Sequence, residues 1–284
     1  MTTLAIPPSR SFAPAPRICS SPVHAPVPRR SYSLDSDEYP LFGHTDDILD
    51  ALVISDLHLG SDNCQAKTAA AFLESILDGA LRARRLIING DVFDSIDFRR
   101  LKKSHWKVLS HIRRLSDKID VTWIAGNHDG SADIVSHLLG VRVVEEFILH
   151  SGAEKILIVH GHQFDDFINE HPILTWLADA AYWLLQKMDR THYIARLAKR
   201  RSKTFVRCRN KIRDGARRLA HARHCTIALC GHTHHAEAAE PTPQWPVAYY
   251  NSGCWTELPS TYLMIRRGKV EACRYAHAAP PLAG

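Results

Sequence analysis

The stretch VTWIAGNHDG, residues 121–130, joins a short apolar run to a glycine, an amide, an imidazole and a carboxylate. Short runs rich in β-branched and aromatic residues are typical of buried strands. A turn explains Gly126 and Asn127 by itself, but it does not require the His128 and Asp129 that follow. The stretch therefore predicts a strand that delivers polar side chains to one end of a sheet.

Four other stretches repeat this arrangement of an apolar run followed by acids, amides or histidines. They are SDLHLG at 55–60, NGDVFD at 89–94, VHGHQFD at 159–165 and CGHTHH at 230–235. Ligand sites of open α/β sheets form at the carboxyl ends of the strands. We therefore expect the polar side chains of all five stretches to meet at one edge of the fold.

The pattern between these stretches predicts an α/β fold. Strands are expected at 51–55, 86–89 and 121–125, with helices at 67–83 and 104–115 between them. Such alternation implies a sheet with right-handed crossovers. Later apolar runs predict a second, antiparallel or mixed sheet, and they lie at 141–150, 155–160, 226–230, 247–252, 261–267 and 269–275.

Composition excludes several classes of protein. The chain has 284 residues, of which 45% are hydrophobic and 23% charged, as in an ordinary globular protein. No apolar run approaches the 18 residues of a membrane span. The seven cysteines form no CxxC pair, so we expect free thiols in a reducing compartment and a cytoplasmic location.

Two segments differ from the rest of the chain. Residues 1–45 are rich in Pro and Ser and predict a disordered tail, with an organelle transit peptide as the alternative reading. Residues 46–284 predict the folded domain, within which 165–224 reads as a basic helical insertion, or cap. The segment 187–223 has fourteen Lys or Arg and two acids, a net charge of +12. This basic surface favours an anionic lipid substrate or peripheral contact with the inner face of an anionic membrane over nucleic acid.

The five polar stretches indicate metal binding. Asp56 and His58 lie two residues apart, as do His232 and His234, so each pair projects to one side of an extended chain and can grip one ion. Oxygen and imidazole donors without thiolate favour manganese, with iron and zinc as alternatives. Two ions need a shared ligand, for which we select Asp91, and such ions lie roughly 3.5–4 Å apart and can hold a hydroxide between them.

The ordered motifs D-x-H, G-D-x-x-D, G-N-H-D, H-G-H and G-H-x-H resemble those of the calcineurin-like metallophosphoesterase superfamily. The resemblance implies a double β-sandwich flanked by helices in four α/β/β/α layers. It assigns one ion to Asp56, His58, Asp91 and His234, and the other ion to Asp91, Asn127, His160 and His232.

The resemblance also implies roles for residues that do not bind the ions. His128 would act as general acid or electrostatic stabiliser at the phosphate, and Asp129 would orient it. Asp94 would support its loop or contact substrate, and Asn63 and His162 are further candidate substrate contacts. We read Asp165 as an ordinary loop carboxylate.

A narrower resemblance connects the chain with UDP-2,3-diacylglucosamine hydrolases. It rests on ISDLHLGS, GDVFD, VHGHQFD followed by a Trp-rich segment, and CGHTH followed by YYNSGCWTE. Those enzymes cleave a pyrophosphate in lipid A synthesis and release UMP and a diacylglucosamine 1-phosphate. The alternatives are a broad-specificity phosphodiesterase, a protein phosphatase or a nuclease of the same fold, or a non-catalytic scaffold.

Overall fold

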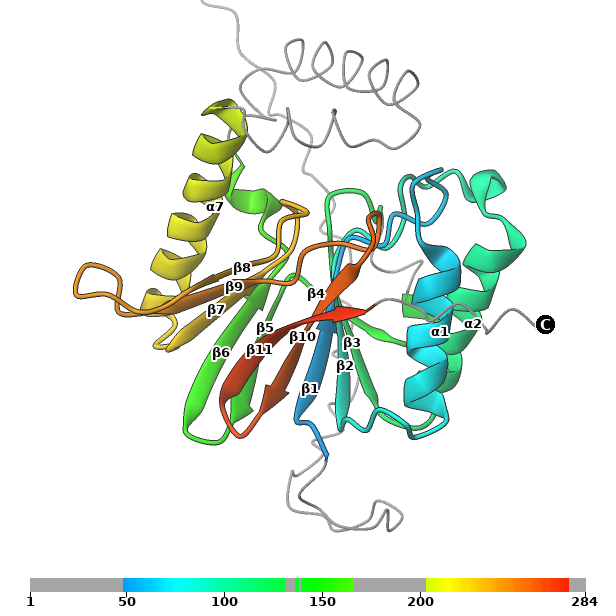
Figure 1. Cartoon of the computed structure of the whole chain (residues 1–284), viewed down its shortest axis with the longest axis horizontal. Coiled ribbons are helices and arrows are strands. Elements are labelled where there is room, and N and C mark those ends of the chain that lie inside the picture. The colour runs from blue at the N-terminus through cyan, green and yellow to red at the C-terminus, as the bar shows by residue number, and fades with distance from the viewer. Residues whose placement is uncertain (1–47, 131–135, 138, 166–202, 276–284) are drawn as a thin grey trace, which may run out of the picture. The chain divides into compact units, whose positions relative to one another are not determined.

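The computed structural model describes residues 48–130, 136–137, 139–165 and 203–275. Its first sheet has the strand order β11-β10-β1-β2-β3-β4 (Figure 1). These strands are β1 (Ala51–Ile54), β2 (Arg85–Asn89), β3 (Asp120–Ile124), β4 (Arg142–Val144), β10 (Ser260–Arg266) and β11 (Lys269–Tyr275). Strands β1 to β4 pair in parallel, so their carboxyl ends lie at one edge of the sheet.

The second sheet has the order β5-β6-β7-β9-β8. Its strands are β5 (Glu146–Ser151), β6 (Glu154–Val159), β7 (Ile227–Cys230), β8 (Glu237–Ala239) and β9 (Ala248–Asn251). The sheet is mixed, as predicted, because β6, β7 and β9 are parallel and the edge strands β5 and β8 are antiparallel to their neighbours.

The predicted membership of this second sheet was partly wrong. The apolar run at 141–150 divides between β4 of the first sheet and β5 of the second. Strands β10 and β11 also belong to the first sheet, where β10 pairs antiparallel with β1. Strand pairing between residues some 200 positions apart leaves no local signal in the sequence, because it depends on how distant segments pack together.

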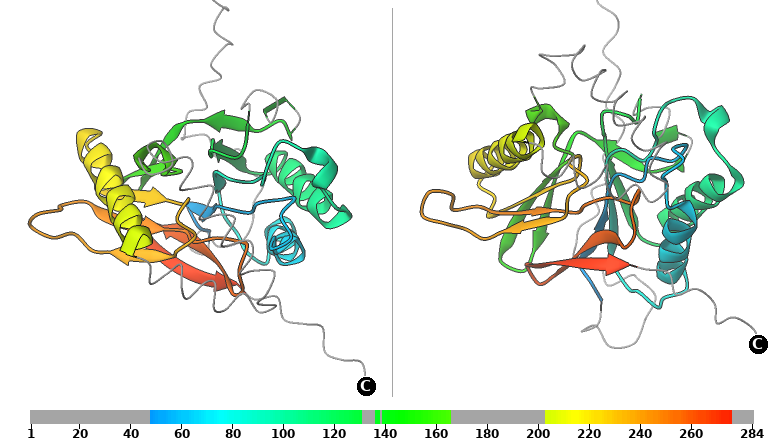
Figure 2. Two further views of the ribbon diagram at one scale, coloured as in Figure 1. Left: turned by 90° about the horizontal axis from the view of Figure 1, so that it is seen from above. Right: turned by 45° about the horizontal axis from the view of Figure 1, so that its top comes forward.

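Helices cover the outer faces of both sheets, which gives four layers (Figures 1 and 2). The helices α1 (Ala66–Leu77) and α2 (Lys103–Ser116) pack on the first sheet, and α7 (Lys203–Ala222) packs on the second. Alternation along β1 shows the layering: Leu52 and Ile54 face α1 and α2, whereas Ala51 and Val53 face the second sheet. The predicted α/β/β/α double sandwich is confirmed.

The helix predicted at 67–83 ends earlier than expected. Helix α1 stops at Leu77, and Gly79 follows with φ = +76°, a left-handed conformation that glycine adopts without steric cost. The helix predicted at 104–115 is confirmed with one more residue at each end.

The long predicted insertion is described only in part. Its last portion, α7, is amphipathic, and Ile212, Ala216 and Ala220 are buried against β6, β7 and β9. Residues 166–202 and the predicted tail at 1–45 lie outside the described residues. None of the helices in the described part of the chain combines the length and apolar content needed to cross a membrane.

Candidate metal centre

The segments that follow β1 and β2 continue side by side beyond the sheet. The backbone N–H of Asp56 donates to the carbonyl of Gly90, and that of His58 donates to the carbonyl of Asp91. Within the second sheet, the N–H of Gly231 donates to the carbonyl of His160. Between the sheets, the N–H of His232 donates to Oδ2 of Asp56. These bonds bring the ends of β1, β2, β6 and β7 together, so the expected meeting of the polar stretches takes place.

The backbone at this edge is held in an unusual conformation. Seven non-glycine residues of the described chain have positive φ, and five of them belong to the polar stretches. Those five are Asp56, His58, Asp91, His232 and His234, with φ between 47° and 64°. A left-handed conformation costs a non-glycine residue about 1–3 kcal/mol and is retained mainly at functional sites. The strain therefore points to this edge independently of the motifs.

A first group of potential ligands comprises Asp56, His58 and His234, whose donor atoms all lie within 4.8 Å of one another. The Nε2 atoms of the two imidazoles are 3.0 Å apart. Oδ1 of Asp56 lies 3.3 Å from Nε2 of His234 and 4.0 Å from Nε2 of His58. The other oxygen of Asp56 accepts a hydrogen bond from the backbone N–H of His232, which leaves Oδ1 for the group.

A second group comprises Asp91, His160 and His232 at the same mutual spacing. Oδ2 of Asp91 lies 3.2 Å from Nε2 of His160 and 3.7 Å from Nε2 of His58 in the first group. Oδ1 of Asp91 accepts from the backbone N–H of His128. A single oxygen of Asp91 thus lies between the two groups, which suits the shared ligand that the sequence predicts.

The donor set fits divalent ions. Oδ1 of Asp56 and Nε2 of His160 are buried and have no hydrogen-bond partner among the described residues. Buried polar atoms are normally paired, so these two need a partner of another kind. Carboxylate oxygens and imidazole nitrogens without thiolate are ligands of Mn²⁺, Fe²⁺ or Zn²⁺ in reactive sites.

Burial and charge perturb the acid–base chemistry of the centre. Burial alone disfavours the charged form of Asp91, but His160 and His58 outweigh it and hold the pKa of Asp91 well below its usual range. Burial likewise opposes the imidazolium of His160, yet the adjacent Asp91 and Asp56 raise the pKa of His160 to about 9. The adjacent carboxylates also raise the pKa of His58 against its burial, so both His160 and His58 favour the protonated form when no metal is bound.

Two glycines let the backbone pass close to these side chains. A Cβ on Gly90, where φ is +81°, would lie 2.3 Å from Nδ1 of His160. A Cβ on Gly126 would lie 2.3 Å from both the backbone nitrogen and Oδ1 of Asp91. The centre therefore requires glycine, for steric reasons, at the first position of both the G-D and the G-N pair.

The structure places Asp129 differently from the prediction. Its buried carboxylate accepts five hydrogen bonds, and none comes from His128. The donors are the backbone N–H groups of Asp91, Val92, Phe93 and Gly126 and the indole N–H of Trp123. Asp129 therefore fixes the segment that carries Asp91 and does not orient His128.

His128 and Asn127 are exposed beside the two groups. Nδ1 of His128 lies 3.0 Å from the carbonyl oxygen of Asp94, and its ring centroid lies 5.2 Å from that of His58. A carbonyl oxygen can only accept, so Nδ1 carries a proton and Nε2 is the nitrogen that remains for a ligand. Asn127 follows Gly126 at the end of β3, and its role as a metal ligand stays a prediction.

The three predicted substrate contacts fall in different surroundings. Asp94 lies against the centre, with one oxygen 3.7 Å from Nδ1 of His58 and the other 2.6 Å from Arg100. Asn63 lies in the turn before α1, where its carbonyl accepts from Gln65. The ring of His162 lies 5.5 Å from that of His160, and burial, with the nearby His160 and His232, lowers the pKa of His162 to about 4.

Sequence reasoning missed Asp165. It was read as an ordinary loop carboxylate, but it is 7% exposed and its Oδ2 lies 3.1 Å from Nε2 of His232. Asp165 directly follows the short helix η3 (His162–Phe164), and its backbone N–H donates to the carbonyl of His162. The H-G-H-x-x-D spacing therefore places Asp165 one helical turn after His162. The H-G-H-x-x-D spacing was the sequence signal for Asp165, but such a spacing is too common to identify a functional carboxylate by itself.

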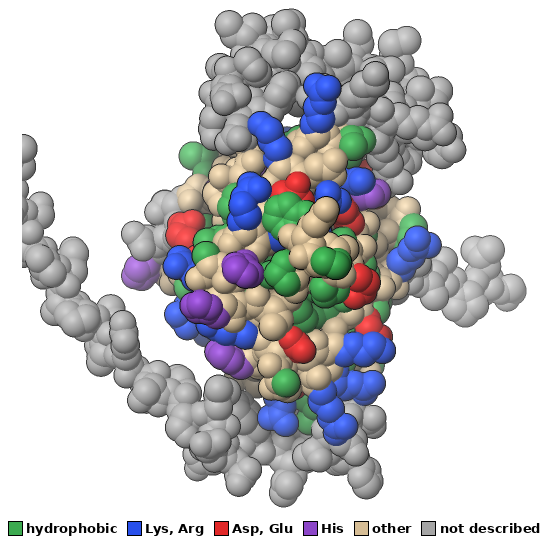
Figure 3. Space-filling view, turned by 90° about the vertical axis from the view of Figure 1, so that its left-hand side faces the viewer, with side chains coloured by type: hydrophobic (Ala, Val, Ile, Leu, Met, Phe, Trp, Pro, Cys, Tyr) green, Lys and Arg blue, Asp and Glu red, His purple; other side chains and the backbone are tan. Residues whose placement is uncertain are grey.

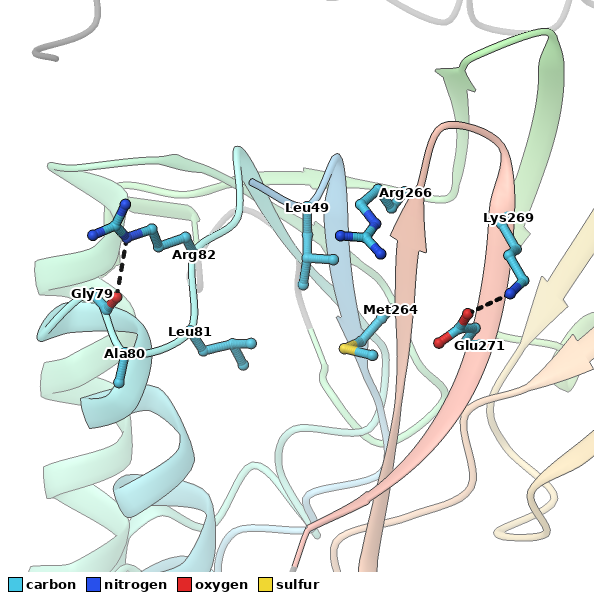
Figure 4. Close-up of a pocket in the computed structure, with 9 residues that line it drawn as sticks. All are labelled: Leu49, Gly79, Ala80, Leu81, Arg82, Met264, Arg266, Lys269 and Glu271. Atoms are coloured by element: carbon cyan, nitrogen blue, oxygen red, sulfur yellow. Dashed lines mark hydrogen bonds and ion pairs between the residues drawn. The ribbon is translucent and has the colours of Figure 1, made fainter. Parts of the chain in front are cut away.

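A separate hollow lies away from the metal centre. It has a volume of about 580 Å³ and is lined by the start of β1, the turn after α1 and the β10–β11 hairpin (Figure 4). Leu49, Leu81 and Met264 form its apolar wall, and Arg266 and Lys269 lie on its rim. Leu49 precedes β1, whereas Asp56 follows it, so this hollow and the metal centre are at opposite ends of that strand.

The sandwich and its paired groups define the protein as a metal-binding α/β sandwich of the metallophosphoesterase type. The chain belongs to the calcineurin-like phosphoesterase family, whose model matches residues 49–236. Family membership and the two groups together support a metal-dependent phosphoester hydrolase with a dinuclear divalent metal site.

Several solved structures are similar to this chain at low identity. A predicted phosphoesterase from Streptococcus pneumoniae is 19% identical over 82% of this chain and 92% of its own, with a TM-score of 0.37. The phosphoesterase YfcE from E. coli is 14% identical over 80% and 99%, with a TM-score of 0.41. Vacuolar protein sorting 29 from Cryptosporidium parvum is 17% identical over 79% and 95%, with a TM-score of 0.39. No curated protein matches the chain.

Metal affinity is expected to rise with pH between 7 and 8. His160 must lose its proton to bind an ion, and its pKa of about 9 in the metal-free protein makes it largely protonated in this window. We expect Mn²⁺ binding to tighten by up to about tenfold over this one pH unit, as for the displacement of one proton. Titration against a competing chelator at both pH values measures the change.

The stability of the metal-free protein should move in the opposite direction. The pKa of His160 is raised above its ordinary value of 6.5, so its contribution to stability is fully present below pH 6.5 and is lost as the pH rises through 9. Urea unfolding in EDTA tests this trend. Metal affinity independent of pH would contradict the assignment of His160 as a ligand.

Proposed function

We propose that the protein hydrolyses a phosphoanhydride or phosphoester with two divalent ions, Mn²⁺ being the favoured metal. The observation that carries this proposal is the position of Asp91, one oxygen of which lies between two groups of carboxylate and imidazole donors. Two divalent ions at such a site supply Lewis-acid stabilisation of phosphoryl oxygens and lower the pKa of a bound water towards ~7.

The protein's own residues would divide the remaining work. Asp56, His58 and His234 would hold one ion, and Asn127, His160 and His232 the other, with Asp91 shared. His128 is exposed beside both groups, and its Nε2 is the nitrogen turned away from the Asp94 carbonyl. We assign to His128 the delivery of a proton to the departing oxygen.

The favoured substrate is a nucleotide-linked glycolipid, UDP-2,3-diacylglucosamine, cleaved to UMP and 2,3-diacylglucosamine 1-phosphate. This choice rests on the resemblance of ISDLHLGS, GDVFD and CGHTH to the hydrolases of that substrate.

The basic helix gives limited support to membrane contact. Arg209 and Arg213 of α7 pair with Glu237, and Arg217 donates to the carbonyls of Ala239 and Glu240. In the described part of this face, Lys and Arg side chains lie in separate groups with acidic and apolar side chains between them (Figure 3). Peripheral association with an anionic membrane therefore stays a proposal. It would depend on exposed Lys and Arg side chains other than Arg209, Arg213 and Arg217.

A substrate panel with added Mn²⁺ tests the proposed function. The panel contains UDP-2,3-diacylglucosamine, a CDP-lipid, a cyclic nucleotide, a phosphopeptide and single-stranded DNA, with bis-p-nitrophenyl phosphate as a general probe. We expect hydrolysis of the general probe and the highest kcat/KM with the UDP-glycolipid. Preference for DNA with a steep salt dependence would favour a nuclease, and tight partner binding without any turnover would favour a scaffold.

His128→Ala is expected to lower kcat by about 10²–10⁴-fold for substrates with poor leaving groups. The loss should be much smaller with p-nitrophenolate, because a weakly basic leaving group does not need a proton. Comparison of the two substrate types measures the difference. His150→Ala is the matched control, since His150 is exposed on β5, away from the centre. Equal losses with both leaving groups would contradict proton delivery by His128.

A further inference from the structure

The carboxylate of Asp165 determines which nitrogen of His232 is free to bind metal. Oδ2 of Asp165 lies 3.1 Å from Nε2 of His232, and both side chains are almost fully buried. An ionised carboxylate can only accept a hydrogen bond, so Nε2 must carry the proton. The lone pair of a neutral His232 is then on Nδ1.

Two other imidazoles of the centre, those of His160 and His58, are held in the same way but through the opposite nitrogen. Nδ1 of His160 lies 2.8 Å from the carbonyl oxygen of Asn89, which leaves Nε2 for the second group. Nδ1 of His58 faces Asp94 at 3.7 Å, which leaves Nε2 for the first group. Oxygen partners behind ligating histidines fix the tautomer and ring orientation and raise the basicity of the ligand. Asp165 completes this pattern for His232.

Asp165 owes its position to helix α7. It follows η3, whose N-terminal residue is preceded by Gly161 with φ = +115°. The ring of Phe164 packs so closely on α7 that a Cβ on Gly215 would lie 2.7 Å from it. A Cβ on Gly161 would lie 3.2 Å from Ile212 of the same helix. Contacts on both sides of η3 therefore fix the direction of the Asp165 side chain.

We propose that Asp165 is a positioning residue of the second metal group, which holds Nε2–H of His232 so that Nδ1 binds the ion, and that α7 keeps Asp165 in place. The proposal rests on the proposed metal-dependent function. Asp165 also adds a negative charge beside a group in which Asp91 is the only carboxylate. The first group has a separate acid, Asp94, which Arg100 partly neutralises. The two acids should therefore act on different ions.

The test is a titration of the metal-free full chain with Mn²⁺, followed by calorimetry and by the electron paramagnetic resonance signal of coupled Mn²⁺ pairs. We expect Asp165→Ala to weaken one of the two binding steps by about 10–100-fold and to leave the other within about twofold. Asp165→Asn keeps an acceptor for Nε2–H without the charge, so it should restore part of the affinity. Asp94→Ala should weaken the other step, and the exposed Asp97→Ala should weaken neither.

A second variant separates positioning from direct contact. Gly215→Ala adds a Cβ against Phe164 on a helix where alanine is intrinsically favoured over glycine by about 1 kcal/mol, so a loss of helix stability is not expected. It should weaken the same step as Asp165→Ala, although Gly215 belongs to neither group of potential ligands.

The outcomes distinguish this inference from the proposed function. Two Mn²⁺ ions bound by Asp165→Ala with wild-type affinities would overturn the inference and leave the proposed function intact. Failure of the wild-type chain to bind any Mn²⁺ would overturn both. Circular dichroism of each variant in EDTA confirms that the comparison is made between folded proteins.

Discussion

Asp91→Ala is expected to abolish metal loading at both groups and to lower hydrolysis of bis-p-nitrophenyl phosphate by about 10,000-fold or more. Each ion contributes several kcal/mol of transition-state stabilisation, and about 5.5 kcal/mol corresponds to four orders of magnitude. Asp91 is the residue whose loss affects both ions, because its Oδ2 lies 3.2 Å from His160 of one group and 3.7 Å from His58 of the other.

The measurement is elemental analysis of the purified variant together with its turnover at saturating Mn²⁺. Asp62→Ala is the matched control, since Asp62 is an aspartate of a neighbouring loop whose side chain is 94% exposed and pairs with Lys102. The control should retain two ions and wild-type turnover. Retained turnover of the Asp91 variant would refute the shared-ligand assignment.

Asp129→Asn is expected to destabilise the fold by about 3–5 kcal/mol, as for loss of one partner in a buried charged network. The native carboxylate accepts from Val92 and Phe93 through Oδ1, and from Asp91, Gly126 and Trp123 through Oδ2. An amide must turn its NH₂ group towards one of these sets of N–H donors. Those donors would then be buried without an acceptor.

Urea unfolding of the metal-free variant measures this loss without any contribution from the ions. Asp117→Asn provides the control, because Asp117 follows α2 with a 64% exposed side chain, and exposed ion pairs of this kind contribute about 0–1 kcal/mol. A stability change below about 1 kcal/mol in the Asp129 variant, accompanied by a large loss of turnover, would support instead the orienting role that the sequence predicted.

Local patterns in the sequence determined the ends of the first three strands and the chemistry of the centre. Apolar runs with both faces buried mark β1, β2 and β3, and the polar residues after them lie at one edge because parallel strands end together. The D-x-H and G-H-x-H pairs carry His58 and His234 on adjacent segments, where their Nε2 atoms are 3.0 Å apart. Residue type and spacing were sufficient here, since both are properties of short segments.

Only the tertiary structure decided the partners of the buried carboxylates and the sheet to which β10 belongs. Asp129 and Asp165 are both acids in polar loops, and their neighbours along the chain do not specify that one accepts five N–H groups and the other faces His232. Hydrogen-bond partners and strand pairs join residues that are distant in sequence, so they depend on how the layers pack. The sequence alone thus determined which donors reach the centre, and the packing of η3 on α7 and of β3 on β2 decided how each donor is held.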